Sequence, residues 1–160
     1  MSVTALQILQ TVAAETGLPI PVTLESTQDA GTLQLVSLLN SAGYEALFYY
    51  TWEQLTKKQL LATVANVSSY PLPADWAYYI DQTQQNLSAK WPLSGPVSTQ
   101  SWSYLENNLV GATNIVYQVR QGNLLLLPVP TAVEQLQLYY VTNGWVSVPS
   151  APGTLSLIHI

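Results

Sequence analysis

The first apolar repeat in the chain covers residues 4–16. Its apolar members recur at the spacing of an amphipathic helix, and they are Leu6, Leu9, Val12 and Ala13. Thr4, with Gln7 three residues later, predicts a capping box at the start of this helix. Gly17 predicts its end. The prolines that follow predict an extended connection to the next element.

A longer apolar repeat begins near Gly31. Its members are three or four positions apart, and they are Leu33, Val36, Leu39, Gly43, Leu47 and Tyr50. This spacing predicts one helix of about 19 residues, about 28 Å long. A glycine inside a helix costs about 1 kcal/mol relative to alanine. Gly43 therefore indicates either the close approach of another backbone or a break, and a split into two helices is the alternative.

Prolines punctuate the middle of the chain. Residues 60–67 are rich in small and β-branched side chains and are predicted as a strand. The basic pair before them, Lys57 and Lys58, is expected at the solvated end of a helix. The sequence Tyr70-Pro-Leu-Pro predicts a rigid turn, because each proline fixes its own φ. Asp75 is then placed to cap a short helix, and residues 81–96 are predicted as loop.

The last third of the chain changes to a period of two. Residues 115–119 alternate between apolar and polar, and the following Arg120-Gln-Gly-Asn predicts a hairpin turn. Residues 124–127 form the expected return strand. Residues 133–141 predict another strand, with one face formed by Leu136, Leu138 and Tyr140.

These patterns predict an α+β fold with an N-terminal helical bundle, a long central helix and a small antiparallel β-sheet. At 160 residues a single domain is expected. Its helical part covers about residues 1–58 and 97–108. The β part covers about 60–73 and 113–148, and a C-terminal tail covers 149–160.

Composition restricts the chemistry. The chain has no cysteine and one histidine, His159, so disulfides and cysteine metal sites are excluded. A Ser-His-Asp triad is implausible with one terminal histidine, and no metal or cofactor is expected. Charged residues make up 8% of the chain, against about 25% in an ordinary soluble domain. A surface of neutral amides suits permanent contact with neighbours, because burying an amide costs less than burying an ion.

Charge and hydropathy exclude further classes. The net charge is −5 and only four residues are cationic, which argues against a protein that grips nucleic acid phosphates. No run approaches the roughly 20 apolar residues that cross a bilayer. The N-terminus lacks the basic and apolar regions of a secretory signal.

Two constellations could carry chemistry. Asp75, Asp81 and Glu106 could place two carboxylates about 5–9.5 Å apart, as glycosidases require. The alternative is that Asp75 caps a helix and Asp81 is solvated. The five tryptophans and ten tyrosines could form a sugar-binding platform, and the alternative is that they anchor the core or an interface. We expect no catalytic residue.

Several short motifs occur in a characteristic order. They are Asn40-x-x-Gly43, Trp52-x-x-Leu55, Tyr70-x-Leu72-Pro73-x-Asp75, Tyr117-x-x-x-x-Gly122-x-Leu124-x-Leu126-x-Pro128-x-Pro130 and Leu138-x-Tyr140. This order resembles the head-to-tail adaptor proteins of tailed bacteriophages, also called connector, head-completion or tail tubular A-type proteins. The resemblance covers about residues 30–142.

The resemblance implies a structural role in the virion, at the junction of head and tail. Such proteins form a ring, commonly of twelve copies, below the portal protein, and offer a site for the tail or nozzle protein. Genomic DNA passes through the ring without specific binding. Terminal segments often reach the portal or a neighbouring copy. The candidate segment here comprises Thr154, Leu155, Leu157, Ile158 and Ile160.

Two other functions remain open. One is a carbohydrate-binding or tail-tip module that uses surface aromatics. The other is a small hydrolase built on the carboxylates at positions 75, 81 and 106.

Overall fold

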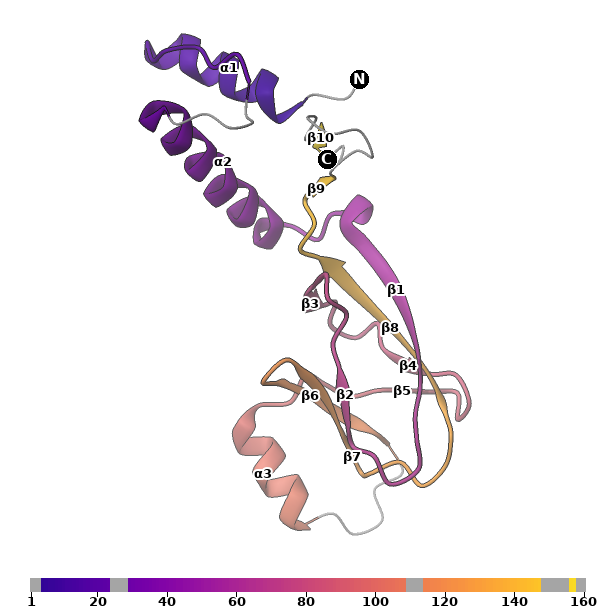
Figure 1. Cartoon of the computed structure of the whole chain (residues 1–160). Helices are drawn as coiled ribbons and strands as arrows, with labels where there is room; N and C mark the ends of the chain where they lie inside the picture. The colour runs from indigo at the N-terminus through magenta and orange to yellow at the C-terminus, as the bar shows by residue number, and fades with distance from the viewer. Residues whose placement is uncertain (1–3, 24–28, 109–113, 148–155, 158–160) are drawn as a thin grey trace. The chain divides into compact units, whose positions relative to one another are not determined.

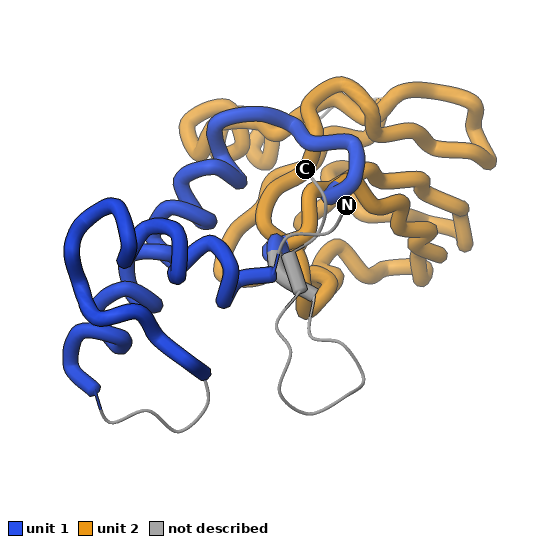
Figure 2. Tube along the Cα trace, turned by 90° about the horizontal axis from the view of Figure 1, so that it is seen from above, with its two compact units in different colours: residues 1–55, 143–160 blue, residues 56–142 orange. Residues whose placement is uncertain are grey.

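The computed structural model describes residues 4–23, 29–108, 114–147 and 156–157. The chain divides into two compact units (Figure 2). Unit 1 combines residues 1–55 with residues 143–160, and unit 2 comprises residues 56–142. The fold is α+β, as the sequence predicts. That the two units unfold together as one domain stays a prediction.

The first helix of unit 1, α1 (Ala5–Thr16), has the predicted ends (Figure 1). The Gln7 amide N–H donates to Thr4 Oγ1 at 3.2 Å, and the Thr4 amide N–H donates to Gln7 Oε1 at 2.9 Å. The capping box is therefore confirmed. Gly17 ends the helix in a left-handed conformation.

The second helix, α2 (Ala30–Tyr49), is continuous through Gly43, so the alternative of a split into two helices is wrong. Asp29 caps its start, because the backbone N–H of Thr32 donates to Asp29 Oδ2 at 2.8 Å and the Thr32 hydroxyl donates to the same oxygen at 2.9 Å. These two bonds hold the pKa of Asp29 below its usual range.

The helices α1 and α2 pack through a small cluster of buried side chains, namely Leu9, Ala13 and Leu35, with Val36 and Leu39 at its border. The third helix, α3 (Thr99–Asn108), belongs to unit 2. Unit 1 therefore contributes a pair of helices, and the expected N-terminal bundle with a long central helix is not supported. None of the helices in the described ranges has the length and apolarity that crossing a membrane requires.

The rest of unit 1 comprises a short 3-10 helix and a pair of short strands. The short 3-10 helix η1 (Glu53–Leu55) follows α2 and forms the predicted Trp-x-x-Leu turn, with the Leu55 N–H donating to the Trp52 carbonyl at 3.1 Å. Strands β9 (Val146–Ser147) and β10 (Ser156–Leu157) pair antiparallel.

Unit 2 contains two antiparallel sheets. The larger follows the order β1-β8-β4-β5, with β3 also paired to β8; the strands are β1 (Thr56–Ala62), β3 (Trp76–Tyr79), β4 (Gln85–Asn86), β5 (Trp91–Pro92) and β8 (Gln135–Thr142). The smaller follows the order β2-β7-β6, formed by β2 (Ser69–Pro71), β6 (Val116–Arg120) and β7 (Asn123–Leu127).

Strand β8 organises the core of unit 2. Its buried residues include Leu136, Leu138 and Tyr140, so the predicted alternation is confirmed. They form one cluster with Leu124 and Leu126 of β7 and further buried residues of the smaller sheet. The two sheets therefore share a single core. Fully burying a leucine side chain stabilises a fold by about 1.5–3 kcal/mol.

The predicted hairpin between β6 and β7 is present. Arg120 pairs with Asn123, which leaves Gln121 and Gly122 as a two-residue loop. Their φ angles are 52° and 74°, and positive φ at both central positions defines the type I′ turn. Gly122 adopts this conformation without steric cost.

Three local predictions in the middle of unit 2 are wrong. The strand expected at residues 60–67 begins at Thr56 and ends at Ala62, so Lys57 and Lys58 lie on a strand. Residues 76–79 form β3 in place of a capped helix, because they pair with β8. Residues 81–96 contain the short strands β4 and β5 within the expected loop.

Candidate functional site

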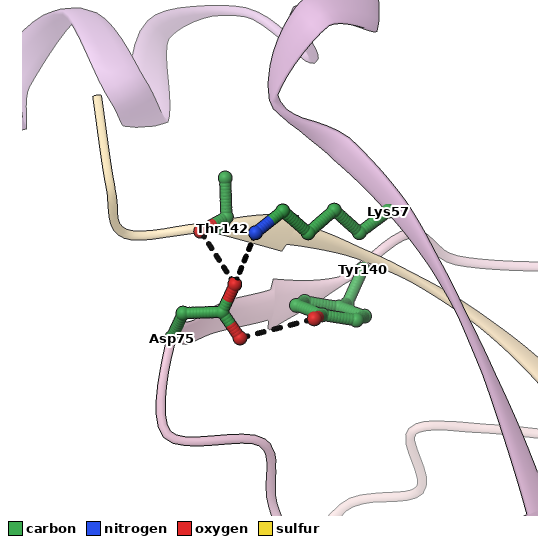
Figure 3. Close-up of polar contacts among 4 residues, drawn as sticks. All are labelled: Lys57, Asp75, Tyr140 and Thr142. Atoms are coloured by element: carbon green, nitrogen blue, oxygen red, sulfur yellow. Dashed lines mark hydrogen bonds and ion pairs between the residues drawn. The ribbon is translucent and has the colours of Figure 1, made fainter. Parts of the chain in front are cut away.

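Asp75 lies at the centre of a polar cluster in unit 2 (Figure 3). The Lys57 ammonium donates to Asp75 Oδ2 at 2.5 Å, and the Thr142 hydroxyl donates to the same oxygen at 3.0 Å. The Tyr140 hydroxyl donates to Asp75 Oδ1 at 3.0 Å. The carboxylate thus ties the turn before β3 to both β1 and β8.

The electrostatics of this cluster favour the ionised form of Asp75. The hydrogen bond from Lys57 holds the pKa of Asp75 below its usual value, burial opposes this, and the bonds from Tyr140 and Thr142 add to it. Burial and the bond to Asp75 raise the pKa of Tyr140. The ion pair itself contributes little, since the side chains of Lys57 and Asp75 are 53% and 36% exposed.

Asp75 therefore does not fit the general acid of the hydrolase hypothesis. A general acid must keep its proton near neutral pH, whereas the pKa of Asp75 is lowered and both of its oxygens accept hydrogen bonds. The structure places Asp81 in the turn after β3 and Glu106 near the end of α3, and both are exposed. In the described ranges no three His, Cys, Asp or Glu side chains lie close enough together to hold a metal ion.

Tyr70 fixes the turn that precedes β2. Its ring is buried, and its hydroxyl donates to the Val67 carbonyl at 2.8 Å. The same hydroxyl accepts from the Val64 N–H at 3.0 Å. A tyrosine in the motif thus satisfies backbone groups that no strand pairs.

The other motif residues of unit 2 also make backbone contacts. The Leu72 N–H donates to the Gly122 carbonyl at 3.2 Å, and the Trp76 N–H donates to the Pro73 carbonyl at 3.0 Å. The Pro130 carbonyl accepts from the Asn66 N–H at 2.8 Å. Pro128 follows β7 through a cis peptide bond. Each of these residues shapes a turn between strands.

The motif residues of unit 1 surround the second half of α2. Gly43 faces the indole ring of Trp145, which the chain supplies about a hundred positions later. The Trp52 indole N–H donates to the Ala46 carbonyl at 2.9 Å, in the last turn of α2. Asn40 lies on the exposed side of α2.

The expected C-terminal contact segment lies mostly outside the described residues. Thr154, Leu155, Ile158 and Ile160 belong to that part of the chain. Leu157 is in β10, whose backbone pairs with β9.

The tryptophans divide into buried and exposed residues. Trp102 and Trp145 are buried, Trp52 and Trp76 are partly buried, and Trp91 is exposed. Trp91 lines a cavity of about 280 Å³ with Pro128 and Glu134. The prediction that aromatics anchor the core therefore fits four of the five.

Sequence reasoning missed the partners of the motif residues. Trp145, Lys57, Tyr140 and Thr142 complete contacts that begin at Gly43 and Asp75. Only the alternation of β8 gave a signal, because it places positions 140 and 142 on one face of the strand.

No protein-family model matches the sequence, and no curated protein is significantly similar to it.

Proposed function

We propose that the chain is a non-enzymatic structural subunit of a tailed-phage virion, the head-to-tail adaptor that joins portal and tail. The observation that carries this proposal is the exposed side of α2. The ordered motifs that resemble the adaptor family support it. Within the described ranges, most of these motif residues shape turns or packing contacts, as expected of a scaffold.

Helix α2 carries large apolar side chains on its exposed side as well as on its buried side, although polar residues lie among the exposed ones. Its inner side packs within unit 1 through Leu35 and Leu47. Its outer side carries large apolar side chains that are between 53% and 88% exposed, namely Leu33, Leu38, Tyr44 and Tyr49. Several large apolar side chains exposed on one element mark an interaction site, so we infer that this outer side meets another protein surface.

Charge indicates the kind of partner. Glu45 is the one charged residue between Ala30 and Tyr49. A surface of this kind suits an equally uncharged partner, because a charge buried against it would lose its hydration. This chain has only 8% charged residues. We infer that the occupant is a second copy of the chain, with helices side by side around a ring.

The excess of acidic over basic residues favours a channel through which DNA passes without being bound. Four cationic residues face nine acidic ones in the chain, and one of the four, Lys57, is paired with Asp75. A channel lined by such subunits repels phosphates over about 8 Å at physiological salt. Tight DNA binding that weakens with salt would contradict this arrangement.

The proposal is tested by the mass of the full chain in solution, measured by light scattering alone and after mixing with the portal protein of the same virus. We expect a complex of one portal with many copies of the chain. A monomer that ignores the portal would overturn the proposal.

Charge substitutions locate the interface. Leu38→Glu with Tyr49→Glu places charges on the outer side of α2 and should abolish the complex. Val129→Glu with Val133→Glu is the matched control, since it adds the same charge at two exposed apolar positions of unit 2. Equal loss in both variants would show that α2 is not the contact.

A further inference from the structure

Three buried polar atoms in the described part of the chain have no hydrogen-bond partner. They are Trp76 Nε1, the Tyr117 hydroxyl and Gln118 Oε1. All three side chains line the same cavity of unit 2, which has a volume of about 490 Å³. We call it the Trp76–Tyr117 cavity. Buried polar groups are normally paired, so their gathering around one cavity calls for a partner within it.

The orientation of the Gln118 amide is fixed by its neighbours. Its Nε2 donates to the Val97 carbonyl at 3.3 Å and to Thr99 Oγ1 at 3.4 Å. A carbonyl oxygen only accepts hydrogen bonds, so the nitrogen must face it and the oxygen must face away. Gln118 is 5% exposed, and its oxygen is therefore a buried acceptor that lacks a donor.

The Tyr117 hydroxyl is also left over. Burial raises the pKa of Tyr117 to about 12, a hydrogen-bond contribution from Gln84 acts against this, and the charge of Asp81 adds to it. No hydrogen bond of normal geometry joins the side chains of Tyr117 and Gln84, however. The Gln84 amide donates instead to the carbonyls of Ile80 and Tyr139 and accepts from the Tyr139 N–H. The Tyr117 hydroxyl thus stays neutral and able to donate.

Aromatic rings form part of the wall of the cavity. The ring of Tyr79 makes edge-to-face contacts with the rings of Trp76 and Tyr117, and the ring centroids are 5.7 Å and 6.0 Å apart. The hydroxyl of Tyr79 is held by Gln59 Oε1 at 3.2 Å. Asp81, Ser98 and Thr99 add polar groups, and no lining residue is cationic.

We propose that the Trp76–Tyr117 cavity binds a neutral sugar unit. The cavity has the size of a small-ligand site. Its unpaired atoms comprise a donor on Trp76, an acceptor on Gln118 and a hydroxyl on Tyr117 that can do either. Sugar hydroxyls both donate and accept, and the apolar faces of a sugar ring pack on aromatic rings. The absence of a cation among the lining residues disfavours an anionic ligand. This inference does not rest on the adaptor proposal.

The test titrates the full chain with the neutral trisaccharides of glucose, galactose, mannose and N-acetylglucosamine. Nitrogen–proton NMR follows the indole N–H signals, and the Trp76→Phe variant identifies that of Trp76. We expect at least one trisaccharide to shift this signal. Tyr117→Phe should weaken that binding about tenfold, because the sugar then loses one hydrogen bond in a shielded site. Trp76→Phe should weaken it comparably, as followed on the backbone N–H signals, since this variant lacks the Trp76 indole signal.

Two control variants make the test specific. Tyr70→Phe removes a hydroxyl that is fully paired within the chain, so it should lower the melting temperature and leave sugar binding unchanged. Tyr117→Phe removes an unpaired hydroxyl, so it should leave the melting temperature unchanged or raise it. Trp91→Phe alters the exposed tryptophan of the other cavity and should leave binding unchanged.

The inference is overturned if no trisaccharide shifts the Trp76 signal at concentrations up to about 10 mM. A dissociation constant above that value would be too weak for useful recognition. In that case the unpaired atoms hold water only. It is equally overturned if binding is lost with Trp91→Phe and kept with Tyr117→Phe and Trp76→Phe.

Discussion

The indole ring of Trp145 occupies the place where a side chain at Gly43 would begin. A Cβ added at position 43 would lie 2.6 Å from Trp145 Cδ2 and closer still to Cε2 and Cζ2. Trp145 is buried in this contact. The sequence indicates close approach at Gly43, and the approaching group is a side chain in place of the expected backbone.

Gly43→Ala should therefore destabilise the protein, although alanine is the better helix former. The substitution gains about 1 kcal/mol in helix propensity, and overpacking against a large ring costs about 1–3 kcal/mol. We expect a net loss of about 1 kcal/mol, measured by urea unfolding. Gly43→Leu should add a larger clash, and under the adaptor proposal it should block assembly into rings.

Gly31→Ala is the control for this prediction. A Cβ at Gly31 meets only Asp29 Oδ2 at 3.3 Å, in the first turn of α2. Alanine there should be neutral or stabilising. If Gly43→Ala raised the stability as much as Gly31→Ala, the close contact with Trp145 would be disproved.

Asp75→Asn should destabilise unit 2 by about 1–2 kcal/mol, because the hydroxyls of Tyr140 and Thr142 then bond to a neutral, weaker acceptor. The half-exposed ion pair with Lys57 adds little to this figure. Lys57→Met separates the two contributions and should cost less than Asp75→Asn. A larger cost for Lys57→Met would assign the stability to the ion pair.

The same carboxylate should make stability depend on pH. The pKa of Asp75 is lower in the folded chain than its ordinary 3.8, so the unfolded chain takes up the proton first as the pH falls. The stability from Asp75 is therefore complete well above pH 3.8 and is lost as the pH falls through the lower, folded-state pKa. Asp75→Asn should flatten this dependence and retain the share of Asp29, whose pKa is also lowered.

Tyr70→Phe should cost about 1–3 kcal/mol, because the part-buried hydrogen bonds of its hydroxyl with the Val64 N–H and the Val67 carbonyl are lost. Urea unfolding measures this loss. Hydrogen exchange at the Val64 amide provides the local test, and its protection should fall. Unchanged protection would show that the turn holds without the tyrosine hydroxyl.

Gln121→Asn should stabilise the β6–β7 hairpin by about 0.5 kcal/mol, since asparagine tolerates positive φ and Asn-Gly is the preferred type I′ pair. Gly122→Ala should have the opposite effect and cost about 1 kcal/mol, because φ is 74° there. Thermal unfolding distinguishes the two. Shifts of the same sign would contradict the turn assignment.

The prediction of a single domain is tested by calorimetry. If units 1 and 2 unfold together, one transition should be seen and its calorimetric and van't Hoff enthalpies should agree. Gly43→Ala lies in unit 1 and Tyr70→Phe in unit 2, so both should shift that one transition. Two transitions, each sensitive to one variant, would divide the chain into two domains.

The sequence predicted correctly those features that depend on interactions between residues close together in the chain. Three features depend on neighbours only a few residues away: the capping box at Thr4, the Gln121-Gly122 turn and the alternation along β8. They were predicted for that reason.

The errors arose where distant pairing decides the structure. Residues 76–79 form a strand because β8 lies beside them, and Asp75 turns to partners 18, 65 and 67 positions away instead of capping a helix. Lys57 and Lys58 were predicted at a helix end, but they lie on β1, which pairs with β8 along one edge only. The Trp76–Tyr117 cavity had no sequence signal, because its residues meet only when both sheets have formed.

The chain enters unit 2 at Thr56 and leaves it at Thr142, and the first residue of β1 pairs with Val141 near the end of β8. The two covalent links between the units therefore start side by side, from the same end of one antiparallel ladder. A mechanical load that pulls the units apart is shared by both links and draws both strands in the same direction. The ladder between them is not forced to slide, so tension along this connection is borne by two backbones at once.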